Sequence, residues 1–247
     1  MTFYVLDSPG TTLALGIITM PRIPRRLILE EGFQTHKMWR SHNKERNLES
    51  NEDKASYLNI LNKELKKQSN ELNAYATMSN HAHELFDIKD KSDFYDLMRN
   101  HHSKYGRFYN DKHDRRGKVA YERPKTCLIG DENYSMTATF YIHANPLRAG
   151  MVKNAADYPW STHKLYAFGK RNKFNRFVKF PKWYMELGKT PEERQRKYRK
   201  LFDAYLRAHG LISKDFLDYY FFGGYSWTER LKQKLKQWRE EGPNAPP

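Results

Sequence analysis

The chain has 247 residues, with 44 Lys and Arg against 29 Asp and Glu, and so a formal net charge of +15. Aromatic residues make up 15% of it, which excludes a disordered chain. Its single cysteine, Cys127, excludes an internal disulfide and a cysteine-based zinc cluster. The cationic excess favours a polyanionic partner, because Lys and Arg that neutralise phosphates release condensed counterions.

Composition also indicates the compartment and the domain boundaries. The apolar run 11–20 is about half of the ~20 residues that a membrane-spanning helix needs, and no basic stretch precedes it as in a signal peptide. We therefore expect no membrane span and a cytoplasmic protein. Residues 1–19 are predicted to be an N-terminal extension, and 20–168 the folded domain. Residues 169–247 are predicted to be a basic, mainly helical, DNA-binding extension, and 171–247 carry 18 Lys and Arg against 9 Asp and Glu.

Apolar periodicity predicts four strands and two helices in the order strand, helix, strand, strand, helix, strand. The corresponding ranges are 25–40, 50–71, 72–78, 81–88, 92–109 and 119–129. Pro124 should place the last of these strands at an edge or a bend, because proline cannot donate a ladder hydrogen bond.

Three more helices are expected, at about 132–145, 190–209 and 226–241. The first should end at Asn145, because the following Pro146 disfavours further helical geometry. The element order predicts an α+β fold, namely a ferredoxin-like (split βαβ) antiparallel sheet with helices on one face, followed by the basic helical extension.

His81 and His83 form the first candidate site. Alternate side chains of a strand share a face, so both imidazoles should point the same way. Two neutral histidines on one rigid face can share a divalent ion. A pair of structural histidines is the alternative, and the pair by itself does not decide between them.

Tyr141 and Asn145 form the second candidate site. Residues four apart on a helix lie on one face, so the phenol and the carboxamide should project together. Such a helix packed under the sheet would supply an oxygen ligand and a nucleophile at one metal ion. The alternative is a tyrosine buried by its ring and an asparagine that caps the helix.

Four segments together resemble a known family. They are Met20-Pro21-Arg22, MSNHAHEL at 78–85, YIHANPLRAGMV at 141–152 and DYPWS at 157–161. In order and spacing they resemble the REP-associated tyrosine transposases, within the HUH single-strand, insertion-sequence-200-like superfamily. The resemblance covers about 20–166, and the family's ferredoxin-like fold agrees with the element order.

The resemblance implies a metal-dependent enzyme that nicks and joins DNA. Tyr141 would be the nucleophile, with His81, His83 and Asn145 as ligands of Mg²⁺ or Mn²⁺. It would attack a phosphodiester of single-stranded DNA to give a 5′-phosphotyrosine and a free 3′-hydroxyl. The implied substrate carries hairpins such as repetitive extragenic palindromes (REP), and the implied location is the bacterial nucleoid.

Cationic residues of the domain are predicted to hold DNA phosphates or read bases. They are Arg22, Arg25, Arg26, Arg123, Lys125 and Arg148. For each one, a solvated surface charge is the alternative.

Two other functions remain open from the sequence. One is a related HUH replication or mobilisation nickase, and the other is a catalytically inactive protein that binds nucleic acid by sequence or hairpin shape. A homodimer and a monomer both remain open. His143 is disfavoured as the base that activates Tyr141, because two positions along a helix is a different face.

Overall fold

The computed structural model describes residues 23–209 and 220–241. Within them a sheet of five strands has the order β2-β3-β1-β4-β5. Strand β1 pairs antiparallel with β3 and β4, and β2 pairs antiparallel with β3. The bounds of the central unit are β1 Gln34–Arg40, α1 Asn51–Leu65, β2 Glu71–Thr77, β3 His81–Asp87, α2 Lys91–Lys112 and β4 Lys125–Ile129. The predicted ferredoxin-like order is confirmed.

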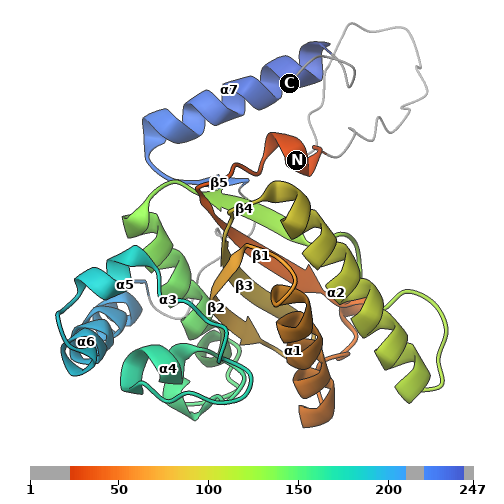
Figure 1. Cartoon of the computed structure of the whole chain (residues 1–247), viewed down its shortest axis with the longest axis horizontal. Helices are drawn as coiled ribbons and strands as arrows, with labels where there is room; N and C mark the ends of the chain where they lie inside the picture. The colour runs from red at the N-terminus through yellow and green to blue at the C-terminus, as the bar shows by residue number, and fades with distance from the viewer. Residues whose placement is uncertain (1–22, 210–219, 242–247) are drawn as a thin grey trace, which may run out of the picture.

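The sheet carries helices on both faces, which corrects the prediction of helices on one face. Helices α1 and α2 lie side by side on one face of the sheet (Figure 1). They pack there against Trp39, Tyr75 and Phe86. Helix α3, Glu132–Arg148, packs on the opposite face against Ala76 and Leu85. The reason is α3's own composition, because it is apolar around most of its circumference and must be covered on two sides.

Helix α3 continues past Asn145 to Arg148 with Pro146 inside it, so the predicted end at Asn145 is wrong. The Ala149 N–H donates to the Asn145 carbonyl at 2.9 Å, and the Met151 N–H donates to the Pro146 carbonyl at 3.0 Å. These bonds close the turn that follows the proline. An interior proline costs about 3 kcal/mol, and burial of α3 between the sheet and later helices offsets that cost.

The fifth strand, β5 Phe221–Phe222, pairs parallel with β4, so the sheet is mixed rather than wholly antiparallel. Helix α7, Tyr225–Glu241, follows it. Leu231 and Leu235 of α7 are buried against Leu128 and Ile23. The edge that β4 would otherwise present to solvent is thus covered by the chain's own C-terminal segment.

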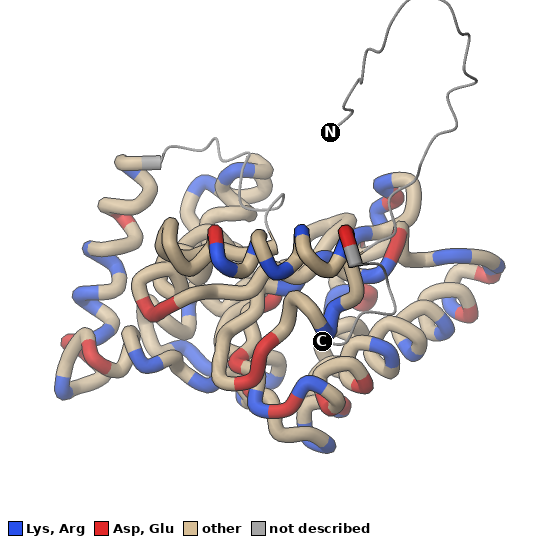
Figure 2. Tube along the Cα trace, turned by 90° about the horizontal axis from the view of Figure 1, so that it is seen from above, with Lys and Arg blue, Asp and Glu red and all other residues tan. Residues whose placement is uncertain are grey.

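The other C-terminal helices pack on the outer side of α3 (Figure 1). The remaining elements are α4 His163–Phe168, α5 Lys182–Glu186, α6 Pro191–His209, and the short helical turns η1 Arg25–Leu27, η2 His42–Lys44 and η3 Ala155–Asp157. Lys and Arg recur along the helices of this last third (Figure 2). In the described residues no helix is both long and apolar enough to span a membrane.

Three buried histidines and the half-buried His102 should make stability sensitive to mild acid. Burial lowers the pKa of His163 to about 4 and holds the pKa values of His101, His102 and His143 well below their ordinary range. Unfolding lets them bind protons below pH ~6.5, so stability present above that pH is lost as pH falls. We expect the free energy of unfolding in urea to fall between pH 6.5 and 5, by up to about 1.4 kcal/mol per pH unit per histidine. A constant value over that window would contradict this.

Candidate active site

His81 and His83 lie on β3 and point to the sheet face that α3 covers. Strand alternation puts them on one side, with ring centroids 5.0 Å apart and ring planes at 89°. His83 is buried, and His81, the first residue of the strand, is half-buried. Nδ1 of His81 is hydrogen bonded to Oδ1 of Asn80 at 2.7 Å. The two imidazoles of the first candidate site are therefore neighbours.

A third histidine, His36 on β1, joins this pair and was not predicted from the sequence. Its Nε2 lies 2.9 Å from Nδ1 of His83, and the two rings stack with centroids 5.1 Å apart. His36 is 2% exposed. Its position diagonal to His83 depends on the register in which Met38 faces His83. That register is set by pairing between distant strands, and no local sequence signal reveals it.

Tyr141, on α3, lies against the same histidines. Its ring meets His83 edge to face at 5.6 Å and His36 at 6.0 Å between centroids. It is 4% exposed and packs with Leu85 and Ile142 in a small core. The predicted nucleophile and the predicted histidines thus meet, although they come from segments about 60 residues apart.

Asn145 lies one turn after Tyr141 and is half-buried. Its Nδ2 donates to the Tyr141 carbonyl at 2.8 Å. This bond fixes the carboxamide on the same helix face as Tyr141. The remaining carboxamide atom, Oδ1, is the oxygen that would be offered to a ligand.

All three imidazoles are held in the neutral form. Burial lowers the pKa of His36 to about 3, and burial together with the charge of Arg40 lowers the pKa of His81 to about 4. Burial, helped by His81, His36 and Arg148, holds the pKa of His83 well below its usual range. Neutral imidazole is the form that binds metal ions.

The ring nitrogens of the pair fit a metal ion. Nε2 of His83 is buried and has no hydrogen-bond partner among residues 23–209 and 220–241. A buried polar atom left unpartnered costs roughly 1–3 kcal/mol, and a bound cation would remove that cost. In His81, Nδ1 is engaged by Asn80, so Nε2 is the nitrogen that would face a ligand.

Arg148, at the end of α3, is the predicted DNA-binding residue that lies in the site. Its guanidinium sits 5.1 Å above the ring of Tyr141 and 5.5 Å above that of Tyr205 on α6. It donates to the Tyr205 hydroxyl at 2.9 Å and to the Tyr141 carbonyl at 3.4 Å. A helix of the C-terminal extension thereby contacts the predicted catalytic helix.

Among the other predicted DNA-binding residues, Lys125 on β4 lies opposite Met38, which in turn lies opposite His83 on β3. Arg25 donates to the Pro124 carbonyl at 2.6 Å, and Arg123 donates to the Ile23 carbonyl, so the pair ties the first described segment to the residues before β4. Arg26 and Lys125 are exposed. Arg22 lies outside the described residues.

His143 is part of a separate buried network. Its Nδ1 and Nε2 each form a 2.7 Å hydrogen bond, the first with the Tyr198 hydroxyl and the second with Oγ1 of Thr162. Both ring nitrogens are occupied, so His143 connects α3 to α6 and to the segment beside β2.

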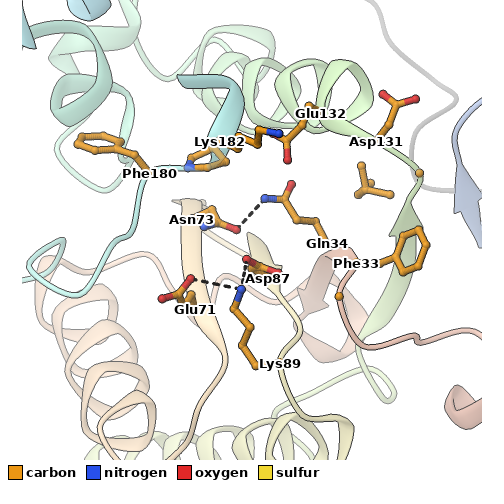
Figure 3. A pocket seen from close by; sticks show the side chains of 14 residues that line it. Phe33, Gln34, Glu71, Asn73, Asp87, Lys89, Asp131, Glu132, Phe180 and Lys182 are labelled. Atoms are coloured by element: carbon orange, nitrogen blue, oxygen red, sulfur yellow. Dashed lines mark hydrogen bonds and ion pairs between the residues drawn. The ribbon is translucent and has the colours of Figure 1, made fainter. Parts of the chain in front are cut away.

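A cavity of about 270 Å³ opens at the other end of the sheet (Figure 3). Gln34 and Asn73 line it and are hydrogen bonded to each other at 3.1 Å. Lys89 lies between Asp87 and Glu71, at 2.7 and 3.8 Å. Asp87 is the last residue of β3 and His81 the first. The predicted site residues therefore lie outside this cavity.

A transposase family model matches part of this chain. Residues 30–145 match the family model described as "Transposase IS200 like". No curated protein matches the chain. Among solved structures, one titled "Structure of the REP associates tyrosine transposase bound to a REP hairpin" is 20% identical, with a TM-score of 0.49, over 58% of this chain and 84% of that one.

The matched segment runs from just before β1 to Asn145 and contains the three site histidines and Tyr141. The match of residues 30–145 to the IS200-like transposase model agrees with the superfamily predicted from the motifs.

Proposed function

We propose that this protein is a transposase-type endonuclease and strand transferase for single-stranded DNA, acting at REP-like hairpins. The observation that carries the proposal is the contact of the Tyr141 ring with His83 and His36 inside the segment of transposase sequence. A buried phenol against neutral, metal-competent imidazoles is the combination that tyrosine-dependent phosphodiester chemistry requires.

His81, His83 and Asn145 would hold the metal, through the Nε2 atoms of the histidines and Oδ1 of the asparagine. In the described residues no group of three His, Cys, Asp or Glu side chains is arranged to hold a metal ion. The third protein ligand proposed here is the carboxamide of Asn145, as the family resemblance implies. Mg²⁺ and Mn²⁺ accept oxygen ligands, and Mn²⁺ also accepts imidazole. When bound, the ion would polarise the scissile phosphate and neutralise its charge.

Tyr141 would make the covalent bond. Its hydroxyl oxygen attacks phosphorus, the P–O3′ bond breaks, the tyrosine proton is lost, and the departing 3′ oxygen takes up a proton. The 5′-phosphotyrosine keeps the energy of the broken diester, so a second 3′-hydroxyl can reverse the step at another end. The Arg148 guanidinium above the Tyr141 ring adds positive charge where negative charge accumulates in the transition state.

The C-terminal helices would hold the hairpin. On α7, Leu231, Leu235 and Trp238 are buried while the basic side chains are exposed. The exposed cations of α6 and α7 are Arg196, Lys197, Lys200, Arg207, Arg230, Lys232, Lys234, Lys236 and Arg239. Exposed cations of this kind suit a polyanion, because each neutralised phosphate releases counterions.

Incubation with a labelled strand that carries a REP-like hairpin tests the proposal. With Mg²⁺ or Mn²⁺ we expect a shortened strand and a protein–DNA species that survives denaturation. Binding without that species, across a range of hairpins and both metals, would favour the alternative, a catalytically inactive hairpin-binding protein.

His36 is proposed to orient His83 for the metal. Each neutral imidazole carries one N–H, and a single proton lies between His36 Nε2 and His83 Nδ1. Nε2 of His83 can bind a metal only if the proton of His83 is on Nδ1, so that Nδ1–H donates to Nε2 of His36. We expect His36→Phe to lower Mn²⁺ affinity about 10- to 100-fold, the usual cost of removing such a partner. Titration of the DNA-free protein with Mn²⁺, followed by electron paramagnetic resonance, measures this.

A conservative variant separates this role from packing. His36→Gln keeps a carbonyl acceptor and should recover most of the affinity, and long-range ¹H–¹⁵N NMR of metal-free protein should show His83 protonated at Nδ1. Mn²⁺ affinity within twofold of wild type in a folded His36→Phe protein would overturn the role.

A further inference from the structure

A row of side chains extends from His81 across the sheet. Arg40 on β1 lies directly opposite His81. On its other side the Tyr121 N–H donates to the Arg40 carbonyl at 2.9 Å, next to an antiparallel bridge between Ser41 and Ala120. Residues directly opposite on antiparallel strands share a face. His81, Arg40 and Tyr121 therefore lie in line on the face that carries the candidate active site.

The outer two members of this row are open to solvent. Tyr121 is 56% exposed, one of the few large apolar side chains so exposed in the described chain. Its ring stacks on His42 at 6.3 Å with planes 28° apart, so the aromatic surface is supported from one side. Arg40 is also exposed, and no carboxylate of the described residues pairs with it. The exposed ring of Tyr121, stacked on His42, thus lies beside the exposed guanidinium of Arg40, which a ligand could bind.

This pair matches the chemistry of a nucleotide. A guanidinium binds a phosphate, and an exposed aromatic ring stacks with any base. A protein partner would need a contiguous apolar patch of several hundred Å², whereas here one ring is flanked by a charge. Two strand spacings of ~4.8 Å put the Cα atom of Tyr121 about 10 Å from that of His81. Tyr121 would therefore lie close to the phosphodiester bond that is cut at the proposed site.

We propose that Arg40 and Tyr121 bind a nucleotide of the single strand next to the scissile phosphate, with its phosphate on Arg40 and its base stacked on Tyr121. The inference rests on the proposed function, because the strand is placed by the active site. It adds a contact with the single-stranded flank that is distinct from the grip of the basic helices on the hairpin.

Two DNA probes isolate this contact: a hairpin with a single-stranded flank, and the same hairpin without it. All proteins carry Tyr141→Phe, so binding is measured without cleavage, by fluorescence anisotropy. Tyr121→Ala should weaken binding of the flanked hairpin about tenfold or more, the usual loss of a base-stacking ring, and leave the bare hairpin unchanged. Tyr121→Trp should restore the affinity for the flanked hairpin. Arg40→Ala should weaken binding of the flanked hairpin as Tyr121→Ala does, and should also reduce the salt dependence of that binding.

Phe168, an exposed aromatic of α4, provides the matched control, because Phe168→Ala should bind both probes as the parent does. If Tyr121→Ala left the ratio of the affinities for the flanked and the bare hairpin unchanged, the proposed nucleotide contact would be overturned. The two proposals fail separately. If the wild type forms the covalent species but Tyr121→Ala has no effect on binding, only the proposed nucleotide contact is rejected. If Tyr121→Ala weakens binding of the flanked hairpin but no covalent species forms in the wild type, only the proposed reaction of Tyr141 is rejected.

Discussion

Tyr141→Phe should abolish the covalent protein–DNA species while leaving the fold and hairpin binding intact. The substitution removes the hydroxyl alone, and the phenyl ring still packs against His83 and His36. No P–O bond can form without that oxygen, so the loss should be complete rather than partial. A denaturing gel of protein incubated with an end-labelled hairpin strand measures it.

Tyr134, on the same helix, is the control for this substitution. Its ring packs edge to face against Phe222 at 4.8 Å, away from the histidines. Tyr134→Phe should form the covalent species at the wild-type rate. A covalent species that persists in Tyr141→Phe would show that another residue is the nucleophile.

His83→Gln should reduce metal-dependent cleavage by about 10²-fold or more. The buried Nε2 of His83 is the nitrogen proposed to bind the ion, and the charge stabilisation that a metal gives a phosphoryl transition state is worth several kcal/mol. Glutamine retains a polar side chain of similar length, which limits the cavity. Single-turnover cleavage measured against Mn²⁺ concentration gives both the rate and the apparent metal affinity.

A second buried histidine shows whether such a loss is general. His163 is hydrogen bonded to the Tyr198 hydroxyl at 2.9 Å and lies outside the site. His163→Gln should cleave at close to the wild-type rate at saturating metal. Equal losses in both variants would indicate that damage to the fold, rather than loss of a ligand, explains the His83 result.

Local patterns predicted much of the central unit and the two pairs of candidate site residues, whereas the meeting of the two pairs was implied by the family resemblance. Strand alternation placed His81 and His83 on one face, and helical spacing placed Asn145 beside Tyr141. Both patterns depend only on residues close in sequence. The order of strands and helices then constrained the topology, because few arrangements satisfy it.

Features that depend on distant contacts were not predicted. His36 meets His83 through the register of β1 with β3, and β5 joins β4 from nearly 100 residues away. The predicted α3 was too short. Local geometry disfavours a helix that continues through Pro146, but the burial of α3 on two sides outweighs that local cost. The reciprocal bonds of Arg25 and Arg123 to backbone carbonyls likewise have no local signal.

The most direct test of the central claim is mass spectrometry of the covalent species after protease and nuclease digestion. We expect one modified peptide, with the mass of a 5′-linked nucleotide on Tyr141, and its absence when metal is chelated. A nucleotide on a different residue, or linked through its 3′ end, would contradict the mechanism proposed for this site.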